Sequence, residues 1–410
     1  MTLPVTSRPG TRNEERGSGL GAPSPGRQPH FLVPRSSFGP RRLRVLQVTE
    51  DLGLGGLEHV AATLCTTLDP DRFETSALCL KDGGALADDL TARGIPVFRL
   101  PPPRGRADYF AATKIARILR RERIDVIHTH NTSAFIDGGL AALLAGTPTH
   151  VHTDHSRLFP DKRRYMIAEY VMSHFAYRVV GVSDHTVDEL RRYERIPLSK
   201  LTTIPNGIDA HAFDRDRDGT AKRRELGIPL TSTIIGAAVR LTEQKGLTYL
   251  LQAMPRILAA QPDTVLVIAG EGVLADSLRE QARSLGVQEQ VRFIGPRRDI
   301  PELLAMFDLY ALPSEWEGLP MIILEAMASG CPIVASDVGG VRMAVRDGEN
   351  GYLVQARDVD ALVQRITALL GDGRRRRQFG EVGRRFFRER FSAEAMAAAY
   401  ARLYTREAAG

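Results

Sequence analysis

The 410-residue sequence has only three cysteines and no long hydrophobic run. Cys65, Cys79 and Cys331 form no C-x-x-C pair and lie inside apolar segments, which argues against a disulfide framework or a zinc site and favours a reducing compartment. No apolar stretch approaches the ~18–20 residues that cross a bilayer, and the first residues lack the continuous apolar core of a signal peptide. We therefore expect a cytoplasmic protein that neither spans a membrane nor is exported.

The charge balance is mildly basic, with 55 Lys and Arg residues against 49 Asp and Glu residues and a formal net charge of +6. This excess fits an anionic partner such as a phosphate, a nucleic acid or an acidic lipid head group. Within Arg104–Arg123, Lys114, Arg117 and Arg121 recur at helical spacing, as in a solvated surface helix or one that contacts acidic lipid at the inner face of the membrane. No basic patch is interleaved with aromatic residues, so the sequence favours no nucleic acid partner.

The length suits two domains of the usual ~100–200 residues. Residues 1–40 are dense in Pro, Gly, Ser and Arg and have no apolar period, so we expect a disordered leader there. Beyond it, short β-type runs alternate with helical segments, and a Pro/Asn/Gly turn cluster at Ile204–Asp209 interrupts the alternation. The pattern predicts an N-terminal domain over 41–205, a C-terminal domain over 206–390 and a helical tail over 391–410.

This alternation predicts an α/β fold of two Rossmann-like doubly wound parallel-sheet domains that face a central cleft. In such sheets ligands bind beyond the carboxyl ends of the strands, so residues that follow strands are the candidates for a site. The strands expected in the first domain are Leu43–Val48, Glu74–Leu80, Val97–Leu100, Val126–His128, His150–Thr153 and Arg178–Val182. Those expected in the second are Thr233–Val239, Thr264–Ala269, Val291–Ile294, Leu309–Pro313 and Pro332–Ser336.

Two cations, Arg240 and Lys245, follow the expected strand Thr233–Val239 and precede a helical segment. A diphosphate fits this position, because arginine binds it with a planar fork and lysine with a point charge. Two solvated surface cations would give the same local sequence. The segment by itself does not decide between these interpretations.

Two glutamates follow the expected strand Leu309–Pro313. Pro320 suits the first turn of a helix, and Gly318 lets the backbone come close to a ligand. Glu317 then lies in the loop at the helix mouth. Glu325 lies on an otherwise apolar helix, where a carboxylate is costly unless it is hydrogen-bonded. The hydroxyls of a ribose or sugar would satisfy Glu325, and so would a structural arginine.

A glycine-rich segment, Gly53-Leu54-Gly55-Gly56, follows the first expected strand and precedes a helix. The segment is compatible with a phosphate-binding loop, a dinucleotide loop or a tight turn. It departs from the G-x-G-x-x-G pattern, which argues against a nicotinamide cofactor. We predict no cofactor.

Histidines follow two expected strands, with His128 and His130 after one strand and His152 and His155 after another. They are compatible with satisfied histidines at strand ends, with a catalytic histidine or with a metal site. No H-E-x-x-H motif or carboxylate–histidine spacing supports a metal.

The segment Asp214–Glu225 fits the spacing of an EF-hand calcium loop, with carboxylates at alternate positions and Gly219 at the turn. No helix is expected before it, and Lys222, Arg223 and Arg224 place cations beside the proposed ion. The sequence therefore predicts no metal site.

Together these segments resemble the retaining glycosyltransferases of family 4, also called the group 1 glycosyltransferases, which have the GT-B architecture. The resemblance runs from about Leu43 to about Phe391 and rests first on paired glutamates spaced E-x7-E, here Glu317 and Glu325. The other matching segments, in the same order, are Ile204–Asp209, Arg240 with Lys245-Gly246, Gly270-Glu271-Gly272, Gly318-Leu319-Pro320, Ala326-Met327-Ala328 and Asp347–Gly351.

The resemblance implies a role for each matching residue. Arg240 and Lys245 would bind the donor diphosphate, and Glu325 would bind the ribose. Glu317 would face the donor sugar, and His155 would reach the same sugar from the first domain, so these two are the candidate catalytic residues. The positions where backbone approaches the donor would be Gly55, Gly56, Gly270, Gly318, Leu319 and Pro320.

The implied reaction is transfer of a sugar from a UDP- or GDP-sugar donor to a glycan, lipid-linked or small-molecule acceptor, with retention at the anomeric carbon. No covalent nucleophile is assigned. One alternative is another two-domain enzyme of nucleotide sugars, such as an epimerase. The other is a non-catalytic protein that binds sugar nucleotides without transferring the sugar.

Overall fold

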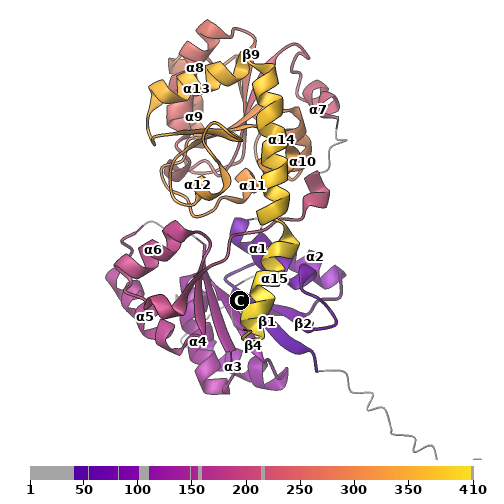
Figure 1. Cartoon of the computed structure of the whole chain (residues 1–410), viewed down its shortest axis with the longest axis vertical. Coiled ribbons are helices and arrows are strands. Elements are labelled where there is room, and N and C mark those ends of the chain that lie inside the picture. The colour runs from indigo at the N-terminus through magenta and orange to yellow at the C-terminus, as the bar shows by residue number, and fades with distance from the viewer. Residues whose placement is uncertain are drawn as a thin grey trace, which may run out of the picture. The chain divides into compact units, whose positions relative to one another are not determined.

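The computed structural model describes residues 41–53, 55–81, 83–100, 110–147, 149–155, 159–213 and 218–407. Two parallel sheets with helices on both faces account for this part of the chain (Figure 1). The expected leader and residues 214–217 of the calcium-loop segment lie outside the described residues. No helix in the described ranges is long and apolar enough to cross a membrane.

The first sheet has seven parallel strands in the order β3-β2-β1-β4-β5-β6-β7. Its strands are β1 (Leu43–Thr49), β2 (Phe73–Cys79), β3 (Val97–Arg99), β4 (Val126–His130), β5 (Thr149–Asp154), β6 (Arg178–Gly181) and β7 (Leu201–Thr203). The helices between them are α1 (Gly56–Thr67), α2 (Ala85–Ala92), α3 (Ala111–Arg121), α4 (Thr132–Ala145), α5 (Arg163–Phe175) and α6 (Asp184–Tyr193), with a 3-10 turn at Leu198–Lys200.

The second sheet has six parallel strands in the order β10-β9-β8-β11-β12-β13. Its strands are β8 (Thr233–Ala238), β9 (Thr264–Ala269), β10 (Val291–Phe293), β11 (Leu309–Leu312), β12 (Ile333–Ser336) and β13 (Gly351–Val354). The helices are α7 (Gly219–Glu225), α8 (Leu247–Ala260), α9 (Ala275–Ser284), α10 (Ile300–Met306), α11 (Met321–Ser329), α12 (Val341–Ala344), α13 (Val359–Leu370), α14 (Gly373–Arg390) and α15 (Ala393–Tyr404), with 3-10 turns at Ala210–Phe213 and Glu243–Lys245.

Helices cover both faces of each sheet, and alternate strand residues point to opposite sides, so neighbouring residues of a central strand enter different cores. In β1, Val45 joins the core beneath α1 and α15, whereas Leu46 joins the core beneath α3 and α4. In β8, Ile234 packs toward α10 and α11, whereas Ile235 packs toward α8 and α13. This arrangement confirms the predicted pair of doubly wound parallel sheets.

Two short edge strands, β7 and β13, are absent from the strands expected from the sequence. β7 has three residues and β13 has four, which is too short for an alternating apolar pattern to stand out. β13 also begins at Gly351, within an Asp/Gly/Asn segment that is typical of a turn. Pro320, which the sequence places in the first turn of a helix, is instead the N-cap residue of α11, and this helix begins at Met321.

The C-terminal helices pack on different sheets. Phe379, Phe386 and Phe387 of α14 belong to the cores of the second sheet. By contrast, α15 packs on the first sheet, where Tyr400 and Tyr404 are buried with residues of its central strands (Figure 1). Helix α15 therefore completes one face of the first sheet.

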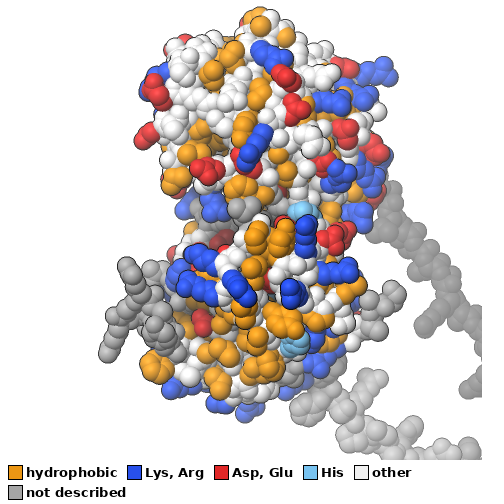
Figure 2. Space-filling view, turned by 90° about the vertical axis from the view of Figure 1, so that its left-hand side faces the viewer, with side chains coloured by type: hydrophobic (Ala, Val, Ile, Leu, Met, Phe, Trp, Pro, Cys, Tyr) orange, Lys and Arg blue, Asp and Glu red, His pale blue; other side chains and the backbone are white. Residues whose placement is uncertain are grey.

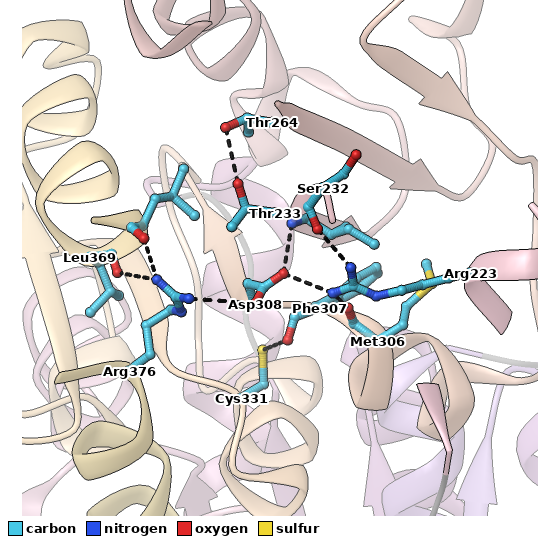
Figure 3. Close-up of polar contacts among 12 residues, drawn as sticks. Arg223, Ser232, Thr233, Thr264, Met306, Phe307, Asp308, Cys331, Leu369 and Arg376 are labelled. Atoms are coloured by element: carbon cyan, nitrogen blue, oxygen red, sulfur yellow. Dashed lines mark hydrogen bonds and ion pairs between the residues drawn. The ribbon is translucent and has the colours of Figure 1, made fainter. Parts of the chain in front are cut away.

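Asp308 joins four elements at the amino end of β11 (Figure 3). Its Oδ2 atom accepts hydrogen bonds from the Arg223 guanidinium and from the Ile234 backbone N–H, both at 2.9 Å. Arg223 also donates to the Ser232 carbonyl at 2.7 Å, and Arg376 of α14 lies 3.8 Å from Asp308 Oδ1. These contacts stabilise the end of β11 opposite to the loop that carries Glu317.

Candidate active site

The loops that follow β8 and β11 lie together at the carboxyl ends of these paired strands. The Glu315 backbone N–H donates to the Gln244 carbonyl at 2.8 Å. Gly246 has a φ of 58°, and a Cβ atom there would lie 2.1 Å from the Pro313 carbonyl oxygen, so the approach requires glycine. The sheet thus brings the loop that contains Lys245 against the loop that contains Glu317.

Glu317 is a buried carboxylate with three side-chain donors around it. Lys245 Nζ lies 2.6 Å and Ser314 Oγ 2.7 Å from its Oε1 atom, and Gln244 Nε2 lies 3.5 Å from its Oε2 atom. The side chains of Lys245 and Glu317 are 13% and 5% exposed, so water screens the ion pair little. The candidate catalytic residue Glu317 therefore also holds Lys245 in place.

The backbone after Glu317 is supported by the Gly339-Gly340 turn that follows β12. The Gly340 N–H donates to the Gly318 carbonyl at 2.6 Å. Gly339 has a φ of 53°, and a Cβ atom there would lie 1.7 Å from the Glu317 carbonyl oxygen. Sequence reasoning missed this turn, although a Gly-Gly pair between a strand and a helix is the same signal that singled out Gly55-Gly56.

Leu319 and Pro320 connect this loop to α11. Leu319 is buried, and its carbonyl accepts a hydrogen bond from Asn206 Nδ2 at 3.0 Å. Because Pro320 is the N-cap residue of α11, the backbone N–H groups of the first helical turn lie next to the loop of Glu317. Such a helix end favours a negatively charged ligand group.

Glu325 lies on α11 and is half-buried. Its carboxylate makes no hydrogen bond or ion pair within the described part of the chain, so the structural arginine that was one explanation for it is not found there. Burial raises the pKa of Glu325 to about 7. A ligand that donates hydrogen bonds to this carboxylate would stabilise its charged form.

Arg240 follows β8 and is exposed. It lies close enough to Glu58 of α1 to oppose the rise in the pKa of Glu58 that burial causes. Gly55 is the N-cap of α1, and a Cβ atom there would lie 2.2 Å from a Glu58 carboxylate oxygen. A Cβ atom on Gly56 would lie 3.1 Å from Met321 Cγ at the start of α11. The glycine loop therefore approaches both Arg240 and α11.

Gly270 follows β9 and has a φ of 134°. A Cβ atom there would lie 1.9 Å from the Val239 carbonyl oxygen, so the residue must be glycine for the β8 and β9 loops to pack. Its N–H already donates to the Gly295 carbonyl at 2.7 Å. Gly270 thus shapes the loops at this end of the sheet, while its N–H is engaged within the protein.

His130, the last residue of β4, and His155, which follows β5, belong to one hydrogen-bonded group. His155 Nε2 lies 2.9 Å from His130 Nδ1, and His130 Nε2 lies 2.8 Å from Gln47 Oε1 on β1. His155 Nδ1 is buried without a hydrogen-bond partner among the described residues. Burial lowers the pKa of His155 to about 3 and lowers that of His130 well below its usual range, so both rings are neutral near pH 7.

His152 lies on the opposite face of β5 and has a structural environment. Its ring stacks on Phe135 of α4 with centroids 3.9 Å apart. Its Nδ1 atom lies 3.1 Å from Thr129 Oγ1, which also contacts His150 Nε2 at 3.0 Å. Of the histidines that the sequence singled out, His155 and His130 therefore form one group and His152 belongs to another.

Residues 218–225 of the calcium-loop segment are described. Asp218 caps α7 by accepting a hydrogen bond from the Thr220 N–H at 2.8 Å. Glu225 pairs with Lys222 and with Arg297, and the nearest Arg297 contact is 2.9 Å. Within the described ranges no group of three or more His, Cys, Asp or Glu side chains is arranged to hold a metal ion.

Two parallel sheets with cations, a helix N-terminus and an unpaired carboxylate at the carboxyl ends of their strands are typical of enzymes that act on phosphorylated ligands. Two family models match the chain. Residues 54–212 match glycosyltransferase family 4, and residues 218–386 match the group 1 glycosyl transferases. The chain belongs to this family of glycosyltransferases, and its two sheets have the GT-B arrangement.

Individual relatives agree with this assignment. The chain is 32% identical over 324 residues to alpha-maltose-1-phosphate synthase of Mycolicibacterium smegmatis, covering 71% of this chain and 82% of the relative. It is 28% identical over 333 residues to UDP-Gal:alpha-D-GlcNAc-diphosphoundecaprenol alpha-1,3-galactosyltransferase of Escherichia coli, covering 78% and 86%. The structure of Anabaena HepE in complex with UDP and glucose superimposes with a TM-score of 0.79 at 23% identity, covering 89% of this chain and 100% of HepE.

Proposed function

We propose that this retaining glycosyltransferase binds a nucleoside diphosphate sugar at the carboxyl ends of β8, β9 and β11 and transfers the sugar to a lipid-linked acceptor. The observation that carries the proposal is Glu325, a half-buried carboxylate on α11 without an internal partner. A ribose supplies two adjacent hydroxyl donors, which match a carboxylate with two free oxygens. Cations stand on the neighbouring loops, where a diphosphate attached to that ribose would lie.

The proposal gives each residue of the site a role. Arg240 and Lys245 neutralise the diphosphate, and the N–H groups at the start of α11 add to their field. The backbone of Gly318, Leu319 and Pro320 lies along the sugar, while Gly55, Gly56 and Gly270 keep the surrounding loops close. Glu317 and His155 face the donor sugar and act as its glycosidic bond breaks.

The leaving group determines what these residues must do. As the bond between the sugar and the diphosphate breaks, negative charge grows on the diphosphate and positive charge grows on the sugar ring. Lys245 lies between the two regions because Glu317 holds its Nζ at 2.6 Å. Fixed charges of this kind stabilise the transition state without reorganising during the reaction.

Donor affinity should depend on pH through Glu325. In the protein without donor, the Glu325 carboxyl has a pKa of about 7. Ribose hydroxyls donate strong hydrogen bonds only to its charged form. Binding below that pH must therefore release a proton, and the affinity should fall by up to about tenfold for each pH unit below about 7. Calorimetric titration with UDP- and GDP-sugars in two buffers of different ionisation enthalpy measures both the affinity and the released proton.

Glu325→Gln is the matched control for this titration. Its amide keeps the size of the side chain but cannot ionise, so binding should be weaker near neutral pH and nearly independent of pH. A nucleotide sugar has no phosphate group that titrates in this range, so the variant tests whether Glu325 is the group that titrates. A wild-type affinity that does not change with pH, or a variant that keeps the pH dependence, would show that Glu325 does not bind the ribose.

A lipid-linked acceptor requires a surface that approaches a membrane, and the α3–α4–α5 face of the first sheet has the required chemistry. Large apolar side chains on this face are exposed, namely Leu140, Leu143 and Leu144 of α4 and Ile167, Val171 and Phe175 of α5. Figure 2 shows hydrophobic side chains gathered in its lower part, over these helices, with Lys and Arg side chains around them. The exposed cations beside them are Arg117, Arg120 and Arg121 of α3 and Arg163 and Arg164 of α5. Apolar groups ringed by cations fit an anionic lipid surface.

The protein should therefore bind vesicles that contain phosphatidylglycerol and phosphatidylcholine more tightly than vesicles of phosphatidylcholine alone. Arg117→Gln with Arg120→Gln should weaken binding at least about tenfold, because each cation near an anionic surface contributes about 1 kcal/mol. Leu143→Gln with Leu144→Gln should weaken it on both lipids. Co-sedimentation at two salt concentrations measures these effects, and Leu230→Gln with Arg283→Gln, exposed residues of the second sheet's domain, serves as the control. Equal losses in the control pair would refute this docking face.

A further inference from the structure

A buried chain of polar side chains links α15 to His155 across the face of the first sheet that α15 covers. Gln47 of β1 stands in its middle and contacts Tyr404 OH through Nε2 at 3.1 Å and His130 Nε2 through Oε1 at 2.8 Å. Beyond Tyr404 the chain continues through His128 Nδ1 at 2.7 Å. Beyond His130 it continues to His155 Nε2 at 2.9 Å. Gln47, His128 and His130 are fully buried, so water does not substitute for these bonds.

Strand register explains why these side chains meet. Gln47 pairs with His128 across β1 and β4, and His130 pairs with Thr153 across β4 and β5. Side chains two residues apart on a strand share a face, so His128 and His130 both point toward α15. Thr153 Oγ1 closes this end of the chain, because it lies 2.7 Å from His128 Nε2 and 2.8 Å from Tyr400 OH.

The amide of Gln47 sets the direction of the hydrogen bonds on both sides. A hydroxyl and a neutral imidazole can each donate or accept on either side, whereas an amide has one end that donates and one that accepts. The Gln47 Nε2–H donates to Tyr404, so Tyr404 donates to His128 Nδ1. The Gln47 Oε1 atom accepts, so His130 carries its proton on Nε2 and its Nδ1 must accept from His155 Nε2–H.

We propose that Gln47 is a positioning residue that fixes His155 as the Nε2–H tautomer and leaves its Nδ1 atom as a hydrogen-bond acceptor. His155 Nδ1 is the end of the chain, and it has no hydrogen-bond partner among the described residues. A buried acceptor without a donor is costly, and a hydroxyl donor offsets that cost. The kinetic consequence rests on the proposed function, because the hydroxyl would then belong to the donor sugar.

Tautomers can be read without substrate from two-bond proton–nitrogen correlations of histidine labelled with nitrogen-15 in the ring. In the wild-type protein His155 and His130 should both be Nε2–H, with the His155 signal identified by its loss in His155→Asn. Gln47→Met removes the acceptor for His130 and should give mixed tautomers at both histidines. Gln47→Glu retains an oxygen acceptor and should restore the Nε2–H forms. An Nδ1–H form of His155 in the wild-type protein would overturn the proposal.

Tyr404→Phe is the matched control, since it removes a hydroxyl from the other branch of the same buried chain. It should change the signals of His128 while leaving His155 as Nε2–H. In transfer assays Gln47→Met should lower kcat about tenfold with the donor KM within about twofold, and Tyr404→Phe should change kcat less than about threefold. Equal losses in both variants with unaltered His155 tautomers would show a merely structural role and overturn the proposal. Absence of transfer in the wild-type protein would instead contradict the proposed function, whereas the tautomer measurement would still test Gln47.

Discussion

Replacing Glu317 by glutamine should lower kcat by about 100- to 1000-fold and change the donor KM by no more than about fivefold. The amide has nearly the same size, so Ser314 can still donate to its oxygen. Its charge is lost, and with it the ion pair that holds Lys245 Nζ at 2.6 Å. Because positive charge grows on the sugar ring as the glycosidic bond breaks, a carboxylate here stabilises the transition state more than the bound donor.

Ser314→Ala is the control for this variant. It removes a neutral donor 2.7 Å from the same carboxylate but leaves the charge and the ion pair in place. A hydrogen bond of this kind contributes about 1 kcal/mol, so kcat should fall by less than about tenfold. Steady-state kinetics of both variants, together with their affinities for the nucleoside diphosphate, separates the two effects. A Glu317→Gln enzyme with wild-type kcat and lost nucleotide affinity would place this residue at the diphosphate rather than at the sugar.

The second sheet was predictable because its central strands β8, β9 and β11 are nearly continuous apolar runs. Both faces of β8 are covered, so Ile234 and Ile235 are buried on opposite sides and the strand is apolar at successive positions. Edge strands lack this signature, since β7 contributes only Leu201, Thr202 and Thr203. Periodicity therefore located the centre of each sheet and missed one edge of each.

The candidate site was predictable at the level of residue type and loop but not at the level of contacts. A cation after β8 and a glutamate after β11 are visible in the sequence, because the carboxyl ends of strands collect functional residues. The ion pair between Lys245 and Glu317 joins residues 72 positions apart and depends on the pairing of β8 with β11. No local pattern encodes such a pairing, so sequence reasoning placed Lys245 at the diphosphate without its carboxylate partner.

The buried chain of hydrogen bonds around Gln47 was harder to predict from the sequence. Gln47 and Tyr404 are 357 positions apart, and they meet only because α15 returns to the first sheet. In the sequence Gln47 is a polar residue within a strand-like run and Tyr404 belongs to an Ala- and Arg-rich tail. A polar residue at a position whose neighbours are buried is nevertheless a usable signal, because a buried amide requires partners.

Removing Lys245 should weaken donor binding more than removing Arg240, although sequence analysis assigns both cations to the same diphosphate. Arg240 is exposed, so Arg240→Ala removes a charge-assisted contact to the ligand worth about 1.5–3 kcal/mol, or about 10- to 150-fold in affinity. Lys245→Ala removes such a contact and also leaves the buried carboxylate of Glu317 without its cation. Calorimetric affinities for the nucleoside diphosphate give the ranking. Thermal melting of both variants should show a loss of stability in Lys245→Ala and not in Arg240→Ala.

For the same reason, substitutions of the two cations should differ in whether their effects add to that of Glu317→Gln. Once Glu317 is neutral, loss of Lys245 no longer leaves a buried charge unpaired. The double variant Lys245→Ala with Glu317→Gln should therefore lose about 1–3 kcal/mol less stability than the sum of the two single losses. Arg240→Ala has no contact with Glu317 to lose, so its effect should add to that of Glu317→Gln within about 0.5 kcal/mol. Double-mutant cycles measured by denaturant unfolding and by donor affinity test both statements. Additive behaviour of Lys245 with Glu317 would show that their 2.6 Å contact contributes nothing to the site, and the division of labour between the two cations would then be wrong.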